Sequence, residues 1–252
     1  MNPADIDIGL CVPVINERAV IGSLLDNIRA LFDGGRYTIC IIDDGSTDGT
    51  VEFVEDRARS DHRIALLKHR KTAPGCRRGA ASRAGLQWLL ANTSHAFYSD
   101  VDADGSHEPE EVLRAVDVAL KTQADVVIAS RYVCGAVVVG RPIARRAGSR
   151  MYNLTLRGLM DWRIRDYSHT FRVYRREAAA LVQRFDPIYD TPVYHVEMLA
   201  IWLSHGLHIV EIPTTYRERR TGTSKVVPSD FLRGVAGALR VGFAYRAGKF
   251  RS

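Results

Sequence analysis

The first 130 residues alternate between short apolar runs and longer segments with helical periodicity. Apolar runs bounded by turn residues are typical of buried strands, whereas apolar side chains that recur every three or four residues indicate amphipathic helices. The predicted strands cover residues 6–14, 37–42, 64–68, 96–100 and 124–130, and the predicted helices cover 17–32, 50–58, 79–91 and 108–120. This alternation predicts an α/β fold, with a Rossmann-like, mainly parallel central sheet and helices on both faces.

The pattern changes after residue 130. Residues 133–140 form an apolar run rich in small side chains and are predicted to be a loop. The remaining pattern indicates helices at 143–162, 176–185, 196–205 and 229–250, strands at 170–174 and 207–213, and a mobile loop at 215–228. Because the chain shows no repeat and no linker, we expect a single domain, residues 1–252, with parts at 6–130, 131–228 and 229–252.

Composition and charge narrow the classes of protein that fit. Apolar residues make up 46% and charged residues 25%, which is ordinary for a globular protein, and no apolar run reaches the length of a membrane span. The first residues do not resemble a signal peptide, and the cysteines form no CxxC pair, so a reduced, cytoplasmic setting is expected. The net charge of +6 favours anionic partners. The chain has no nucleic-acid-binding signature, so no nucleic-acid partner is expected.

Three acidic residues alternate near the end of the strand that begins at residue 96. Asp100, Asp102 and Asp104 are followed by Gly105, Ser106 and His107. Strand periodicity would place the three carboxylates on one side, where they repel each other unless a cation lies among them. Mg²⁺ or Mn²⁺ takes one or two carboxylates and completes its coordination with water and substrate phosphates. The alternative is an acidic, solvated loop beyond a strand.

Other polar clusters also follow strands. Residues 13–17 end the first strand, and Asp43 and Asp44 end the second. In parallel α/β sheets, ligands bind outside the carboxyl ends of the strands. The common placement of these clusters therefore favours the metal interpretation over the solvated loop, although residues 43–46 also suit a plain turn.

Six motifs together resemble a known family. They are VPVINE (12–17), IIDDGSTDGT (41–50), DADGSHEP (102–109), ASRY (129–132), DYSHTFRVYRRE (166–177) and RRTGTSK (219–225). The chain resembles inverting family-2 glycosyltransferases with the GT-A fold from about residue 6 to 240. Within that family it is similar to dolichyl- or polyprenyl-phosphate mannose synthases.

The resemblance implies a donor site in residues 6–130 for a nucleotide-diphosphate sugar. The expected reaction moves a hexose, mannose from GDP-mannose, onto a polyprenyl phosphate with inversion. A Mg²⁺ or Mn²⁺ ion would be held by Asp102, Asp104 and Ser106, with Asp104 catalytic, and would neutralise the leaving diphosphate. The positions that match donor-binding residues of the family are Pro13, Asn16, Glu17, Asp43, Asp44, Gly79 and Asp102.

The resemblance also implies an acceptor half at residues 131–228. The acceptor phosphate would be bound by Arg131, Arg145 and Arg146, because arginine makes bidentate contacts to phosphate. Of these three, Arg131 and Arg145 are the predicted catalytic residues. The alternative for Arg145 and Arg146 is that they are solvent-exposed charges on a helix and bind nothing. A phosphate acceptor is already anionic, so Glu197 receives only a supporting role. Arg219, Arg220, Ser224 and Lys225 would close over the donor phosphates. His169 departs from the family, which has a small residue there.

A lipid acceptor implies action at the cytoplasmic face of a membrane. The apolar residues 133–139 could approach the acyl chains, and the C-terminal helix carries Phe231, Val235, Leu239 and Phe243 at four-residue spacing. That row could instead pack against the domain or against a membrane-anchored partner subunit. Two other functions remain open. One is a family-2 enzyme with a UDP-sugar donor and a hydroxyl acceptor, and the other is a catalytically idle nucleotide-sugar-binding subunit.

Overall fold

The computed structural model describes residues 1–69, 77–104, 108–217 and 228–251, and only the backbone of residues 228–231. Several predicted site residues lie outside the described part of the chain. They are the proposed metal ligand Ser106 and the proposed phosphate-binding residues Arg219, Arg220, Ser224 and Lys225. Their roles therefore stay predictions.

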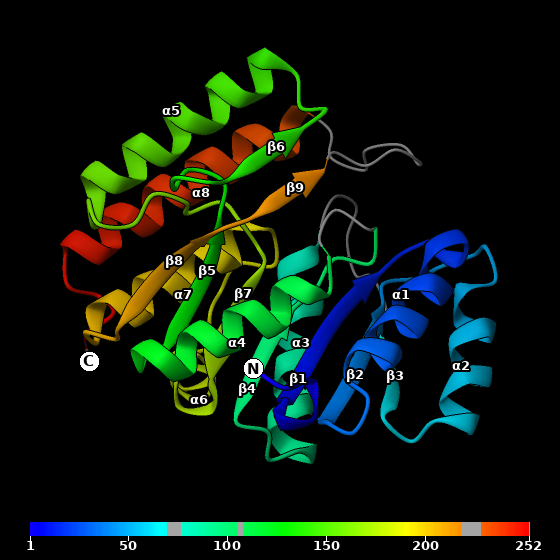
Figure 1. Ribbon diagram of the computed structural model, residues 1–252. Helices are drawn as coiled ribbons and strands as arrows, with labels where there is room; N and C mark the ends of the chain where they lie inside the picture. Colours follow the sequence, from blue (N-terminus) through cyan, green and yellow to red (C-terminus); the bar gives the residue numbers. More distant parts are fainter. Residues whose placement is uncertain (70–76, 105–107, 218–227, 252) are drawn as a thin grey trace.

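A seven-stranded sheet forms the centre of the molecule (Figure 1). Six strands are parallel, and the antiparallel β7 lies between β4 and β5. In spatial order the strands are β3 (Ile64–Lys68), β2 (Arg36–Asp43), β1 (Asp7–Val14), β4 (Phe97–Asp100), β7 (Arg172–Arg175), β5 (Val126–Ser130) and β8 (Ile209–Pro213). The predicted mainly parallel α/β sheet is confirmed.

Helices cover both faces of this sheet, and each face has its own apolar core. One core joins the sheet to α1 (Arg18–Leu31), α2 (Thr50–Ser60) and α4 (Glu110–Thr122). The other joins it to α3 (Arg78–Asn92), α6 (Arg176–Arg184) and α7 (Val193–Ser204). A 3₁₀ turn, η1 (Pro3–Asp5), precedes β1. This two-sided burial explains why the strands read as continuous apolar runs.

A second, two-stranded sheet lies above the first. β6 (Val137–Val139) pairs in parallel with β9 (Thr215–Arg217). The prediction of loops over 133–140 and at 215–217 was wrong for these residues. Each of the two short segments supplies the backbone hydrogen-bond partners of the other, which sequence periodicity cannot reveal.

Two helices lie side by side at the end of the molecule opposite α2 (Figure 1). They are α5 (Ile143–Leu159) and α8 (Pro228–Arg246), and α8 also packs on α7. Close approach is possible because α8 carries glycine at the contacts: a Cβ added at Gly242 would lie 3.0 Å from the side chain of Leu159. None of the helices in the described residues is at once long and apolar enough to span a membrane.

Candidate active site

Loops that follow β1 and β2 are hydrogen-bonded to each other at the carboxyl edge of the sheet. The Asn16 N–H donates to Ser46 Oγ at 2.8 Å, and Asn16 Oδ1 accepts from the Thr47 N–H at 2.8 Å. Asn16 has a φ of 53°, a left-handed conformation that asparagine tolerates. The Glu17 N–H donates to Thr50 Oγ1 at 3.1 Å. In this structure, therefore, Asn16 shapes the rim of the predicted donor site.

The two acids that end β2 differ in their surroundings. Asp43 accepts hydrogen bonds from the backbone of Gly45 at 3.0 Å and of Ser46 at 3.1 Å, so it builds the turn. Asp44 Oδ1 lies 3.0 Å from His69 Nδ1. The plain-turn interpretation thus describes Asp43, whereas Asp44 and His69 form a polar pair at the strand ends. Pro13, beside Ile42 in the β1–β2 pair, precedes this edge.

The acidic segment leaves the sheet earlier than its alternation predicts. β4 ends at Asp100, so Asp102 and Asp104 lie in the turn beyond it. Asp100 is buried, where it accepts a hydrogen bond from the Tyr174 hydroxyl at 3.2 Å and lies 3.9 Å from His195 Nε2. Period-two alternation stops where the strand stops, so the expectation that the three carboxylates share one side stays a prediction.

Asp102 is held between two side chains of the described structure. It forms an ion pair with Arg78 at the start of α3, and Thr170 Oγ1 donates to its Oδ2 at 3.4 Å. Asp104 follows two residues later and is partly buried. The acidic turn is thus adjacent to α3 and to the segment before β7, which are far from it in sequence.

The residues of this turn fit a hard divalent cation. The guanidinium of Arg78 on Asp102 shows that this carboxylate lies where a positive charge is stabilised. Two carboxylates are the number that Mg²⁺ commonly takes from protein, with water and substrate phosphates filling the other positions. Across the described residues, no group of three or more His, Cys, Asp or Glu side chains forms a cation site. Asp102 and Asp104 therefore suit a site that substrate completes.

Tyr216 on β9 is close enough to both the acidic turn and the basic half for their charges to affect its pKa. Burial raises its pKa, the charges of Asp102 and Asp104 add to this effect, and Arg141 and Arg131 oppose it. The Arg131 guanidinium carbon is 5.7 Å from the centre of its ring. This tyrosine therefore marks the boundary between the predicted donor and acceptor regions.

Arg131 is buried in an ion pair with Asp166. Its Nε and Nη2 donate to the two carboxylate oxygens at 2.9 and 2.8 Å, and Nη2 also donates to Ser168 Oγ at 2.6 Å. Only 7% of the Arg131 side chain is exposed. Burial alone would raise the pKa of Asp166, but Arg131 outweighs it and holds that pKa well below its usual range. If Arg131 contacts a phosphate, it must therefore do so while it remains paired with Asp166.

His169, the departure from the family pattern, is buried next to the same pair. Its backbone N–H donates to Asp166 Oδ1 at 3.1 Å, and its ring packs edge-on against Tyr216 with centroids 6.1 Å apart. Its position links the Arg131 pair to Tyr216. An imidazole here therefore shapes the wall between the two regions.

The helix α5 is attached to the Arg131 region through its inner face. Ser149 Oγ lies 2.6 Å from the Tyr132 hydroxyl, and Asn153 Nδ2 donates to Ser168 Oγ at 3.0 Å. Arg145 and Arg146 are exposed in the first turn of the same helix. The structure thus brings the helix that carries Arg145 and Arg146 next to Arg131, as an acceptor site requires.

Gly79 and Glu197 hold the segment before α7. A Cβ at Gly79 would lie 2.3 Å from the Thr191 carbonyl oxygen. Glu197 accepts from the backbone of Ile188 and Tyr189 at 3.2 Å each, and burial raises its pKa. Glu197 thus fixes the backbone of this segment, and its supporting role in the reaction stays a prediction. Gly79 is required here because a side chain would collide with the backbone of Thr191, which the sequence did not reveal. The predicted proximity of Gly79 to a nucleotide stays a prediction.

Sequence reasoning missed three residues of this edge: Arg78, His69 and Tyr216. Arg78 had a usable signal. Arg77 and Arg78 lie at the N-terminus of a helix, where a positive charge is unfavourable because it opposes the helix dipole. Two arginines at such a position indicate that they have a role other than stabilising the helix. His69 and Tyr216 follow no motif and reach the site only through the fold.

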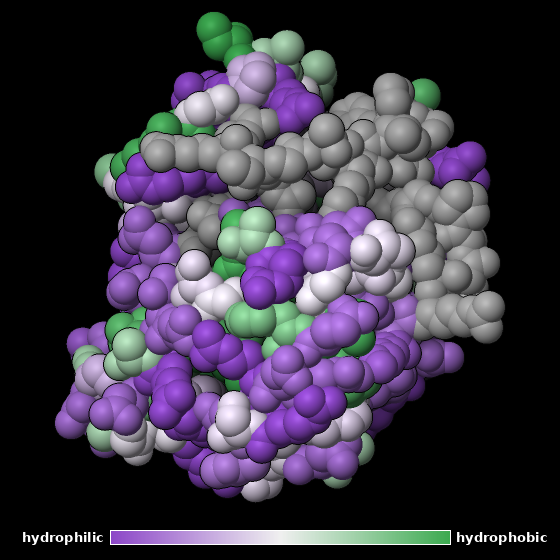
Figure 2. Space-filling view, turned by 90° about the vertical axis from the view of Figure 1, so that its right-hand side faces the viewer, coloured by the Kyte–Doolittle hydropathy of each residue, from purple (hydrophilic) through white to green (hydrophobic). Residues whose placement is uncertain are grey.

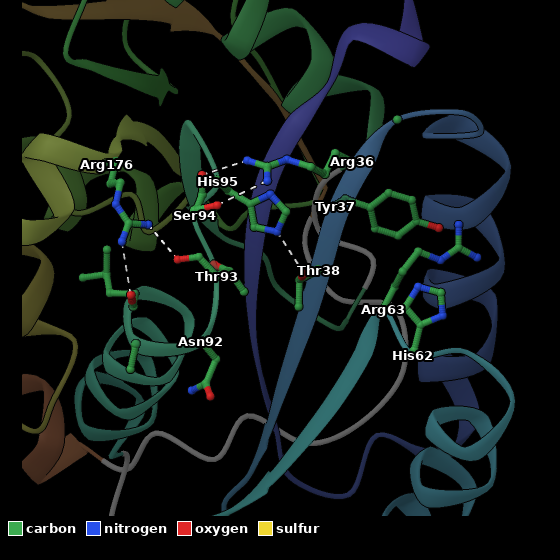
Figure 3. Close-up of a pocket in the computed structure, with 13 residues that line it drawn as sticks. Arg36, Tyr37, Thr38, His62, Arg63, Asn92, Thr93, Ser94, His95 and Arg176 are labelled. Carbon is green, nitrogen blue, oxygen red and sulfur yellow. Dashed lines mark hydrogen bonds between the residues drawn. The ribbon is translucent and has the colours of Figure 1, made fainter.

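A cavity of about 650 Å³ lies at the opposite edge of the sheet (Figure 3). Its cationic side chains already have partners: Arg36 pairs with Asp7, and Arg63 pairs with Asp61. Arg176 donates to the Thr93 carbonyl at 2.8 Å, at the end of α3. These contacts hold secondary-structure ends together, so the carboxyl edge remains the candidate active site.

Comparison with known proteins gives the family. The model of "Glycosyl transferase family 2" matches residues 10–181. The chain is 33% identical over 222 residues to polyprenol monophosphomannose synthase of Mycolicibacterium smegmatis, covering 87% of this chain and 80% of that one. It is also 33% identical over 236 residues to undecaprenyl-phosphate mannosyltransferase of Micrococcus luteus, covering 93% of each.

Solved structures show the fold. Glucosyl-3-phosphoglycerate synthase from Mycobacterium tuberculosis, in complex with Mn²⁺, UDP and glucosyl-3-phosphoglycerate, aligns with a TM-score of 0.64 at 23% identity. The alignment covers 97% of this chain and 81% of that chain. The same enzyme with Mg²⁺ and UDP also gives 0.64, at 22% identity, and covers 96% of this chain and 80% of that chain. The expected GT-A fold is confirmed, and the chain belongs to glycosyl transferase family 2.

Proposed function

We propose that this enzyme transfers a hexose, mannose from GDP-mannose, to a polyprenyl phosphate with inversion at the anomeric carbon. One observation carries the proposal: the ring centre of Tyr216 lies 5.7 Å from the guanidinium carbon of Arg131, and the carboxylates of Asp102 and Asp104 add to the rise in its pKa that burial causes. A cation-binding turn suits a nucleotide diphosphate, and a basic region suits an anionic acceptor. The names of the two mannosyltransferase relatives support the same assignment.

The donor side is built from the acidic turn and its neighbours. Asp102 and Asp104 would hold Mg²⁺ or Mn²⁺, which when bound neutralises the diphosphate leaving group. Arg78 adds a second positive charge at the same place. Asp44, paired with His69, offers a carboxylate oxygen to N–H or hydroxyl donors of the nucleoside. These residues orient the donor so that its anomeric carbon faces the acceptor region.

The transfer step needs no general base when the acceptor is a phosphate. An ionised acceptor oxygen attacks the anomeric carbon, and the bond from that carbon to the diphosphate breaks, with its electron pair leaving on the diphosphate. Arg145 and the Arg131 region would bind the acceptor phosphate. Asp166 and Glu197 already accept hydrogen bonds within the fold. Their engagement favours a phosphate acceptor over a hydroxyl acceptor, which requires a base.

A polyprenyl acceptor places the reaction at a membrane surface, at the cytoplasmic face in this proposal. Its phosphate lies at headgroup level, and the basic side chains of α5 can meet it there. A membrane-anchored partner subunit could bring the enzyme to the same place.

A two-by-two assay tests the function. Purified enzyme with Mg²⁺ is offered GDP-mannose or UDP-glucose, each with a polyprenyl phosphate in detergent or with 3-phosphoglycerate. We expect product only from GDP-mannose and polyprenyl phosphate. Product from UDP-glucose and 3-phosphoglycerate would replace the proposal with the hydroxyl-acceptor function. Nucleotide-sugar binding without turnover in any combination would favour the idle subunit.

A further inference from the structure

The helix α5 carries an apolar row on its exposed side. The exposed fraction is 84% for Ile143, 70% for Met151 and 53% for Leu154, and Ala147 between them is exposed as well. These positions are separated by four, four and three residues, so they lie on one face of the helix. A row of large apolar side chains in water is unfavourable, and it indicates a surface that is covered by something else.

The opposite face of α5 is packed against the protein. Asn153 and Leu156 on that face are buried, and Asn153 makes the hydrogen bonds that fix the helix to the Arg131 region. The apolar row is therefore directed away from the body. Packing against the described residues does not explain it.

Arginines flank the apolar row. Arg146, Arg150 and Arg157 repeat at four- and seven-residue spacing and lie along one side of it. Beside them is a cavity of about 380 Å³, lined by Tyr132, Arg150, Asn153, Leu154, Arg157 and Arg165. This lining holds three guanidinium groups and no carboxylate, and within the described residues no ion pair joins Arg150 or Arg165 to an acid. Such a cavity suits a phosphate group.

The neighbouring helix α8 repeats the pattern. Leu232 is 69% exposed and Phe243 is 61% exposed, and Arg233 and Arg240 are exposed close to them. Two members of the predicted row, Val235 and Leu239, are half-buried, and the side chain of a third, Phe231, lies outside the described residues. Exposed apolar side chains also occur elsewhere, at Leu120 and Ile188, but α5 and α8 each carry more than one. In Figure 2 the face formed by α1 and α2 is mainly hydrophilic, and hydrophobic side chains gather at the top, where α5 begins.

We propose that the outer face of α5, defined by Ile143, Ala147, Met151 and Leu154, docks on an anionic phospholipid bilayer. The apolar row enters the boundary between headgroups and acyl chains, and the cavity with Arg150 and Arg165 receives a headgroup phosphate. An exposed apolar row flanked by arginine is the combination that binds such a surface, since apolar burial and lipid charge both contribute.

The docking surface is joined to the catalytic region by short contacts. Ser149 and Asn153, on the inner face of α5, contact Tyr132 and Ser168, and Ser168 accepts from Arg131. A bilayer seated on the outer face would therefore be separated from the Arg131 region by the width of one helix, about 10 Å. This inference rests on the proposed lipid acceptor for its purpose, but the binding itself can be measured separately.

Vesicle flotation tests the docking. The enzyme is mixed with vesicles of phosphatidylcholine alone or with 30% phosphatidylglycerol, on the order of the anionic content that attracts basic helices. The test variant is I143N/M151Q/L154Q, and the matched control is L120Q/I188Q, which removes exposed apolar side chains elsewhere. We expect wild type and control to float with anionic vesicles and the test variant to bind at least tenfold more weakly.

A second variant, R150Q/R165Q, examines the headgroup cavity. It should lose most of the preference for anionic over neutral vesicles while keeping its fold. If the α5 variant floats as well as wild type, or if wild type does not float, the inference is overturned. In the second case a partner that covers α5 becomes the better explanation.

An activity comparison separates this inference from the proposed function. The α5 variant should transfer sugar normally to a polyprenyl phosphate in detergent micelles and lose activity on the same acceptor in anionic vesicles. Equal activity of variant and wild type in vesicles contradicts the docking role. Failure of wild type in both settings contradicts the proposed function instead, and the flotation result would stand.

Discussion

Arg131 and Arg145 were both predicted to bind the acceptor phosphate, yet they occupy different environments. Arg131 is buried against Asp166, whereas Arg145 is exposed on α5. Arg131→Ala should lower the free energy of unfolding by about 3–5 kcal/mol, because it leaves Asp166 buried without its partner. Arg145→Ala should change that free energy by no more than about 0.5 kcal/mol and raise the KM for the acceptor. Urea denaturation and steady-state kinetics measure the two effects.

The Arg131–Asp166 pair also predicts a pH dependence. The pKa of Asp166 is lower in the folded protein than in the unfolded chain, where it is about 4. The pair's contribution to stability is thus fully present above about pH 4 and is lost as the pH falls toward the folded pKa. Asp166→Asn should flatten this part of the stability curve. An unchanged acid slope in that variant, or no loss of stability in Arg131→Ala, would contradict the assignment.

Asp104 is predicted to be essential for turnover. Asp104→Asn should reduce kcat on the order of 10²-fold or more, since charge neutralisation at a leaving group is commonly the largest catalytic contribution. Excess EDTA should abolish the activity of wild type, and Mg²⁺ or Mn²⁺ should restore it. Asp56→Asn, an exposed acid on α2, is the control. Full activity of wild type in EDTA would refute the metal role.

At the residue scale, the sequence identified positions better than roles. Alternating acids and DDGS located the edge of the sheet, because strand ends and turn residues are local features. Asp43 proved to build its own turn and Asp100 to face the core, since both depend on where a strand stops. Arg78 and Tyr216 join the site from distant segments. Local pattern carries no information about such contacts.

At the scale of elements, amphipathic and apolar patterns predicted most boundaries to within a few residues. α7 shows the limit. Its residues 193–202 are all buried, so it lacks a polar face, and its predicted start at 196 was three residues late. The short strands β6 and β9 were missed because each has three residues, and their pairing joins segments more than 70 residues apart. Tertiary contact, not propensity, makes them strands.

Two glycines in helices give a matched prediction. A Cβ at Gly79 would meet the backbone of Thr191 at 2.3 Å, whereas one at Gly148 on α5 would meet nothing within 4 Å. Gly79→Ala should therefore destabilise the protein by about 1–3 kcal/mol, and Gly148→Ala should stabilise it by up to about 1 kcal/mol. Thermal unfolding compares them. If Gly79→Ala keeps the melting temperature but loses nucleotide affinity, the glycine serves the nucleotide instead.

At the scale of the whole molecule, the two predicted halves share one sheet. Residues 6–130 supply β3, β2, β1, β4 and β5, and residues 131–228 supply β7 and β8. In space β7 lies between β4 and β5. One apolar core likewise combines Cys11 and Leu86 of the first part with Tyr174 and Trp202 of the second. The predicted donor and acceptor parts therefore belong to one interleaved fold.

This interleaving predicts that the donor half does not fold alone. A fragment of residues 1–130 would leave β5 without either of its neighbours, β7 and β8, and would expose the apolar side of α3 that packs on α6 and α7. The fragment should show no cooperative unfolding transition. The full chain should show one, with equal calorimetric and van't Hoff enthalpies, as expected for a single cooperative unit. Two separate transitions in the full chain, or a fragment that unfolds cooperatively and binds nucleotide, would instead establish independent domains.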